Sequence, residues 1–354
     1  MHLRLVAAVA VGAFLSTAAF AQTLYEICEF GDLSGPGDFT EGFGINDAGH
    51  IVGRRYEAET GTSHAFFWDR RNPLRDLGTL PGDMGSVAFS VNDHDVVTGQ
   101  SYGDESHVFV WRKVTGMKPL QGPDDSVRPI SPAAINNSGQ IVGRTQDDGF
   151  TWDPVEGLRP LPPIIGLMYT FPSDINNNGR IVGNGFGNPA SPTFLIDLRT
   201  LRQQLLPLSF VDSINDRGQV GGAITTPAGL RAAIWDRVKG VTRLGEFPGG
   251  EASSIARDMN NAGTIVGVSS TGEFDAPGRG FTWDKRNGLQ VLTDLVDRPM
   301  DFLIPEAINN RGWIVANGRD LGTFDYRAVL LIPLSHRKHP RASHCESDDD
   351  VAEQ

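Results

Sequence analysis

The 354-residue chain has few cysteines, few aromatic residues and no excess of positive charge. Two cysteines are too few for a scaffold held together by disulfides. With 31 basic against 43 acidic residues the net charge is −12, so a basic surface for nucleic acid is missing and we expect no nucleic-acid partner. Aromatic residues make up 8% of the chain, whereas 42 glycines and 22 prolines favour a turn-rich all-β protein.

The chain also has only one long apolar run, from Leu3 to Phe20. Arg4 lies near its start and Ala19-Phe20-Ala21 at its end, the pattern of a signal peptide with a cleavage site. We therefore predict a signal peptide over residues 1–21 and a secreted or periplasmic protein with no membrane span after cleavage. A membrane anchor is the alternative, but the run is near the lower length limit for spanning a bilayer.

What the chain does contain is a repeated unit, seen most clearly as Ile175-Asn176-Asn177-Asn178-Gly179-Arg180-Ile181-Val182-Gly183. The residue after the Asn is always Asp or Asn, and a Gly stands three residues after it except in the second copy, which has Asp95. These residue types predict a tight hairpin turn leading into a buried β-branched strand. A further Gly inside that strand in six copies predicts a bulge or a close backbone approach. The seven copies begin at Asn46, Asn92, Asn136, Asn176, Asn215, Asn260 and Asn309.

Each copy contains two more strand-like segments. The first is clearest at residues 64–68 and 107–111, and the second is a short apolar piece such as Met117-Lys118-Pro119-Leu120. With the strand that leads into each Asn, one repeat of about 44 residues holds about four strands, as a propeller blade does. We therefore predict an all-β, seven-bladed β-propeller over residues 22–334.

The turn motif, the sequence His-Ala-Phe-x-Trp at residues 64–68 and Asp76-Leu77-Gly78-Thr79-Leu80 together resemble the HAF repeat family of predicted extracellular bacterial repeat proteins. The resemblance covers nearly the whole chain after the signal. It implies an arrayed architecture and an extracytoplasmic location, and it implies no activity and no site residue. The His of this motif survives only as His64 and His107, so we expect no catalytic His shared by the repeats.

The two ends of the repeat region are complementary. Residues 25–30 alternate like the last strand of a repeat, whereas the seventh copy stops near residue 334 without that strand. The N-terminal strand is therefore expected to complete the seventh blade and leave no open sheet edge.

Residues 335–354 form a polar tail that we predict to be disordered. Because two cysteines in an oxidising compartment are expected to pair, we predict a disulfide between Cys28 and Cys345. A metal bound by His336, His339, His344 and Cys345 is the less favoured alternative, and we assign neither a metal nor a cofactor.

Three further patterns allow a functional interpretation. Asp174-x-Asn176-x-Asn178-Gly179 matches the start of a calcium loop, but a hairpin turn explains it better. Asp47, Asp93 and Asp216 would share one face of the ring, yet each stands where other copies have Asn, so no catalytic residue is assigned. A stripe of aromatic residues could stack sugars, although a core between blades is favoured. The stripe comprises Phe66, Phe109, Phe150, Phe194, Phe281, Trp68, Trp111, Trp152, Trp235 and Trp283.

Two classes of function are left open. The favoured one is a binding or scaffold propeller for an unknown protein or glycan, and the alternative is a glycan-acting hydrolase or lyase. The binding face is expected in the segments that differ most between copies, which are residues 54–63, 122–132, 160–172, 184–192 and 269–279. An enzyme should instead show two or more carboxylates that converge on one deep axial pocket.

Overall fold

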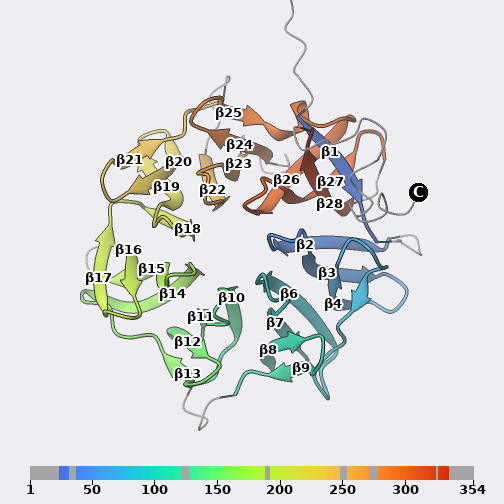
Figure 1. Ribbon diagram of the computed structural model, residues 1–354, viewed down its shortest axis with the longest axis horizontal. Coiled ribbons are helices and arrows are strands. Elements are labelled where there is room, and N and C mark those ends of the chain that lie inside the picture. Colours follow the sequence, from blue (N-terminus) through green and yellow to red (C-terminus); the bar gives the residue numbers. More distant parts are fainter. Residues whose placement is uncertain are drawn as a thin grey trace, which may run out of the picture.

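The computed structural model describes residues 24–31, 37–121, 127–187, 192–247, 253–270, 278–323 and 326–334. Within them the chain forms seven four-stranded antiparallel sheets arranged as blades in a ring (Figure 1). The predicted seven-bladed β-propeller is therefore confirmed. The predicted signal peptide, the tail and Cys345 lie outside the described residues. No helix in the described part is long and apolar enough to cross a membrane.

The first six blades each use four consecutive strands, numbered from the axis outward. Blade 1 is β2 (Phe39–Ile45), β3 (Ile51–Glu57), β4 (Thr62–Trp68) and β5 (Arg75–Asp76). Blade 2 is β6 (Gly85–Val91), β7 (Val97–Tyr102), β8 (Ser106–Arg112) and β9 (Gly116–Pro119). Blade 3 is β10 (Ser131–Ile135), β11 (Ile141–Arg144), β12 (Gly149–Asp153) and β13 (Gly157–Pro160).

The next three blades repeat this order. Blade 4 is β14 (Leu167–Ile175), β15 (Arg180–Gly187), β16 (Thr193–Asp197) and β17 (Arg202–Leu206). Blade 5 is β18 (Phe210–Ile214), β19 (Val220–Thr226), β20 (Gly229–Asp236) and β21 (Gly240–Arg243). Blade 6 is β22 (Ser253–Met259), β23 (Ile265–Ser270), β24 (Arg279–Asp284) and β25 (Gly288–Val291), followed by the short 3₁₀ helix η1 (Leu292–Asp294).

Blade 7 joins the two ends of the repeat region. It contains β26 (Met300–Ile308), β27 (Ile314–Asp320) and β28 (Tyr326–Pro333), and its outermost strand is β1 (Tyr25–Glu29). β1 runs antiparallel to β28, with Tyr25 opposite Pro333 and Glu29 opposite Val329. The predicted closure by the N-terminal strand is confirmed. Cys28 lies fully buried on this strand, but its pairing with Cys345 stays a prediction.

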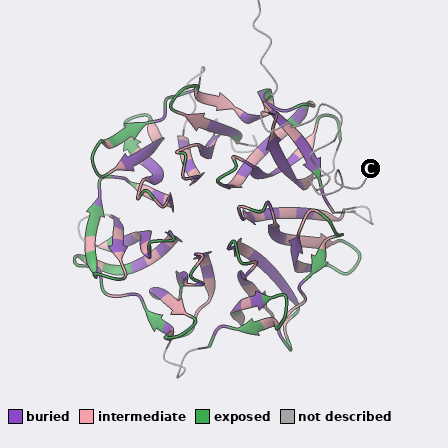
Figure 2. Cartoon of the chain, viewed as in Figure 1, coloured by how far each residue is buried: buried purple, intermediate pink, exposed green. Residues whose placement is uncertain are grey.

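The core lies between neighbouring blades, and exposure increases towards the outer strands (Figure 2). The five phenylalanines of the predicted stripe, such as Phe109 and Phe150, are at most 2% exposed. Across the first blade interface, Phe67 stacks on Trp111 with ring centroids 5.5 Å apart. The phenylalanines are therefore core residues, and the sugar-stacking interpretation of them is wrong.

Every innermost strand carries a bulge at the residue three positions before the repeat Asn. In blade 1 the pairing with β3 shifts between Gly42 and Gly44, so Phe43 has no partner, and the other six blades shift at the equivalent place. The bulge brings the carbonyl oxygen of Glu41 so close to Gly53 that a Cβ there would lie 1.8 Å from it. This contact is the close approach that the repeated Gly predicts.

Candidate functional site

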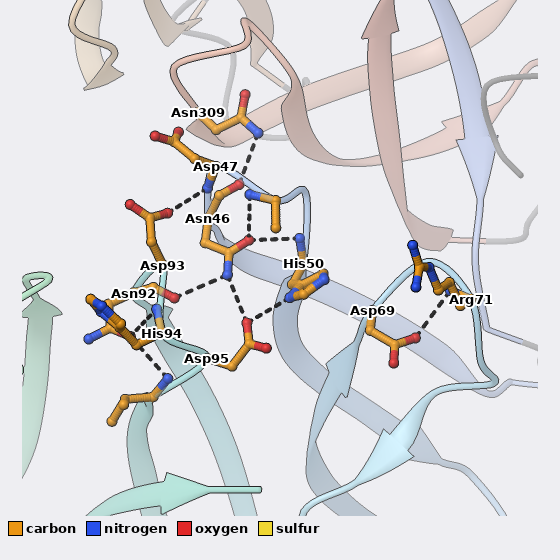
Figure 3. Close-up of polar contacts among 12 residues, drawn as sticks. Asn46, Asp47, His50, Asp69, Arg71, Asn92, Asp93, His94, Asp95 and Asn309 are labelled. Carbon is orange, nitrogen blue, oxygen red and sulfur yellow. Dashed lines mark hydrogen bonds and ion pairs between the residues drawn. The ribbon is translucent and has the colours of Figure 1, made fainter. Parts of the chain in front are cut away.

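The seven repeat asparagines form a closed circle of hydrogen bonds around the axis. Each Asn side-chain amide donates to the backbone carbonyl of the equivalent Asn in the next blade at 2.9–3.2 Å, and Asn309 returns to Asn46. Figure 3 shows the part of this circle around Asn46, whose Oδ1 also accepts N–H groups of its own turn from Ala48 and His50. We call these residues the Asn circle. All seven are at most 5% exposed, so they act as inter-blade ties.

The residues that follow the asparagines form a second circle, the Asx circle. In each blade the backbone N–H of this residue donates to Oδ1 of its counterpart in the next blade at 2.8–2.9 Å. Asp and Asn both present an Oδ1 acceptor at the same distance from the backbone, which explains why every repeat has one or the other at this position. The members are Asp47, Asp93, Asn137, Asn177, Asp216, Asn261 and Asn310.

The three carboxylates of the Asx circle therefore lie on one face of the ring, as the sequence predicted. Their oxygens already accept hydrogen bonds from the protein. Besides accepting a backbone N–H, each carboxylate accepts an amide from a neighbouring Asn, and Asp216 accepts from both Asn177 and Asn261. The two circles and the apolar residue before each Asn line a pocket of about 160 Å³. Among the described residues no group of three or more His, Cys, Asp or Glu side chains is placed to hold a metal ion.

Asp174 also serves as an inter-blade tie. Its carboxylate accepts the N–H of Ile175 at 2.7 Å and that of Ile214, in the next blade, at 2.8 Å. Asp258 bridges blades 6 and 7 through Met259 and Ile308 in the same way. Burial raises the pKa of Asp174 to about 7 and that of Asp258 to about 6. Both oxygens of Asp174 are engaged, so this position is a structural link, in line with the preference for a turn over a calcium loop.

The bulged residues of the seven innermost strands form a third circle, the bulge circle. Neighbours in this circle touch across blades: the rings of Phe43 and Phe89 are 5.7 Å apart, and Arg257 forms an ion pair with Glu306. The innermost strands surround the axis of the ring (Figure 1), and all seven bulged residues are partly exposed. We infer that their side chains line the space around the axis, which we call the central channel. In blade order the circle is Phe43, Phe89, Ala133, Ser173, Asp212, Arg257 and Glu306.

This circle has an apolar arc over blades 1–3 and a polar arc over blades 4–7. Burial raises the pKa of Asp212 to about 7, against the opposing effect of the Arg257 guanidinium and with further repulsion from Asp174 and Glu306. Burial also raises the pKa of Glu306, and the positive charge of Arg257, its ion-pair partner, offsets part of that rise. The polar arc thus holds two carboxyls with raised pKa values, and one of them, Asp212, has a pKa near neutral, a property often found in functional groups.

The sequence analysis did not identify Asp212, Arg257 and Glu306. A usable signal was present, because the position three before the Asn differs in size and charge from copy to copy, whereas the position directly before the Asn is apolar in every copy. Each innermost strand begins at one end of the channel and runs toward its Asx turn at the other end. The segments expected to bind a ligand connect strands at the end where the innermost strands begin, opposite the Asx turns. Residues 122–126, 188–191 and 271–277 of those segments lie outside the described part.

No family model and no curated protein matches this chain. The fold is similar to that of several solved propellers. A Mycobacterium tuberculosis puromycin-hydrolyzing peptidase is 12% identical with a TM-score of 0.57, over 90% of this chain and 52% of that one. A catalytically inactive virginiamycin B lyase from Staphylococcus aureus, solved with quinupristin, is 11% identical with a TM-score of 0.54, over 87% and 99%. The extracellular domain of a one-component system from B. thetaiotaomicron is 11% identical with a TM-score of 0.55, over 87% and 39%. At these identities the likeness shows the fold alone, a β-propeller.

Proposed function

We propose that the protein is an exported binding propeller whose ligand contacts the bulge circle in the central channel. The observation that carries this proposal is the contrast between the three circles. The Asn circle is uniform and the Asx circle holds only Asp or Asn, whereas the bulge circle holds six residue types. A bulge frees its residue from the strand pairing that builds the sheet and changes the direction of its side chain. The bulged side chains can therefore differ from blade to blade, and such an asymmetric set suits an asymmetric ligand.

Export is proposed from the apolar run at residues 3–20 and from the resemblance to the HAF repeats. Secretion and the periplasm are both consistent with those features. The loops at the end of the channel opposite the Asx turns would form the outer rim of the same site, where a larger protein or glycan partner would make contact.

The test compares ligand-induced thermal shifts in three proteins, each without the signal peptide. The channel variant carries Phe89→Ala and Asp212→Asn, and the control variant carries Asp47→Asn in the Asx circle. Sugars, amino acids, amines and short peptides are screened against each. Ligands that stabilise the wild type and the control should fail to stabilise the channel variant. If every such ligand stabilises all three proteins equally, the channel is not the binding site.

A hydrolase or lyase that acts on glycans is the second candidate, and one observation favours it. Asp212 and Glu306 face the same channel on either side of Arg257, and both have raised pKa values, as general acids often do. Binding is preferred because Glu306 is already paired with Arg257, so the bulge circle holds no second unpaired carboxylate for an acid–base couple. Turnover of a glycan panel by the wild type, lost in Asp212→Asn, would favour the enzyme instead.

A further inference from the structure

The Asp212 carboxylate is an unfilled hydrogen-bond acceptor on the channel wall. It lies in the bulge circle between Ser173 and Arg257, and no described residue forms a hydrogen bond or an ion pair with it. Arg257, the nearest cation in the circle, is paired with Glu306 on its other side. Since an ionised carboxylate offers about four acceptor positions, a partly buried one without donors has room for a ligand group.

The surroundings of Asp212 carry a surplus of negative charge. One guanidinium, that of Arg257, stands among several carboxyls that interact with Asp212 or with its neighbours. Burial, with mutual repulsion as a smaller cause, raises the pKa of three of them, Asp174, Asp212 and Asp258. A positive ligand relieves this repulsion, whereas a neutral ligand does not and an anion adds to it. The carboxyls are Asp174 on β14, Asp212 on β18, Asp216 in the turn after β18, Asp258 on β22 and Glu306 on β26.

The other side of the bulge circle is apolar. Phe43 and Phe89 lie in contact and Ala133 follows them, so the arc of blades 1–3 offers two aromatic rings and a methyl group. Aromatic faces bind apolar groups and attract cations. A ligand that fits both arcs has a positive group at one end and an apolar body at the other.

Building on the proposed function, we propose that the channel ligand is an organic ammonium ion with an apolar body. Its ammonium group donates to the Asp212 carboxylate and to the Ser173 hydroxyl, and its body packs on Phe43 and Phe89. The Ser173 hydroxyl, which belongs to the polar arc, already accepts a hydrogen bond from the Asn184 side-chain amide at 3.0 Å, and this bond restrains its orientation.

The experiment uses three probes of similar size: phenethylammonium, 2-phenylethanol and phenylacetate. Their binding to the chain without its signal peptide is measured by calorimetry. In the wild type at a pH above the pKa of Asp212, phenethylammonium should bind about tenfold more tightly than the alcohol, because a charge-assisted hydrogen bond is gained. Its affinity should fall as the pH drops and Asp212 takes up a proton, while the affinity of the alcohol stays constant.

Asp212→Asn should remove both the preference for the cation and its pH dependence, with little effect on folding because Asp212 supports no hydrogen bond among the described residues. The matched control is Asp104→Asn, the same change of charge at an exposed loop position, which should keep both properties. Equal affinity for the ammonium ion and the alcohol, a preference that survives Asp212→Asn, or no binding of phenethylammonium would each overturn the proposal.

Failure of the ligand class can be separated from failure of the site. If the alcohol or phenylacetate binds and Phe89→Ala weakens that binding, the channel is the site and the cationic class is wrong. A second outcome is that Phe89→Ala leaves unchanged the affinity for both of these probes and for every ligand found in the thermal-shift screen. In that case the proposed binding function of the channel is wrong as well.

Discussion

The Asn circle and the bulge circle surround the same axis and are made by the same innermost strands and their turns, but they have opposite chemistry. Every Asn side chain is buried and engaged in hydrogen bonds to its own turn and to the next blade. In the bulge circle, residues are partly exposed and Asp212 has no partner among the described residues. A repeat protein can vary a side chain more readily where the packing of neighbouring repeats depends on it less. Sequence variation between repeats therefore marks the surface that is available for a ligand.

The largest effect is expected from opening the ring that supports both circles. Deleting residues 24–30 removes the outer strand of blade 7 and the buried side chains of Tyr25, Ile27, Cys28 and Phe30. The loss of this apolar burial should cost more than about 5 kcal/mol in the free energy of unfolding, comparable to the stability of many domains. Aggregation and a strongly lowered melting temperature should follow. An unchanged melting curve would contradict closure by β1.

Breaking the Asn circle should come next. In Asn92→Ala three hydrogen bonds are lost: the one that the Asn92 side-chain amide donates to the carbonyl of Asn136, and the two that its Oδ1 accepts from the N–H groups of His94 and Val96. Leaving these buried groups unsatisfied should lower the free energy of unfolding by about 3 kcal/mol or more. Urea unfolding measures the change, and Phe89→Ala in the bulge circle is the comparison, with a smaller loss expected for its partly exposed ring. Equal losses would remove the distinction between a structural and a functional circle.

A smaller effect is expected in the Asx circle, where the structure corrects a simple expectation. The repeats suggest that Asp and Asn are interchangeable there, but Oδ2 of Asp216 accepts amides from Asn177 and Asn261. Asp216→Asn replaces that oxygen by a donor and should cost about 1–2 kcal/mol in unfolding free energy. Asp104→Asn should cost nothing measurable. A silent Asp216→Asn would show that turn geometry alone selects these residues.

The smallest effect concerns pH. The pKa of Asp212 is raised to about 7, so the native state binds a proton that the unfolded chain, with an ordinary pKa near 3.8, has released. Its contribution to stability is therefore present at acidic pH and is lost as the pH rises towards 7. Asp174 and Asp258 act in the same direction. Melting temperatures of the wild type should fall across this range and those of Asp212→Asn should fall less, and parallel curves would argue against a buried, titrating Asp212.

The sequence by itself determined the repeat length, the turns, the strand count, the glycine at the close approach in six of the seven blades and the strand that closes the ring. These features depend on residues within one repeat or on the two chain ends, and local geometry restricts which residues can occupy them. The circles around the axis came only from the tertiary structure, because they join residues 39 to 49 positions apart, or 263 where Asn309 meets Asn46. Asp212, Arg257 and Glu306 are unremarkable within their own repeats. They come near one another because bulges in separate blades place them around one axis, and no single repeat encodes that arrangement.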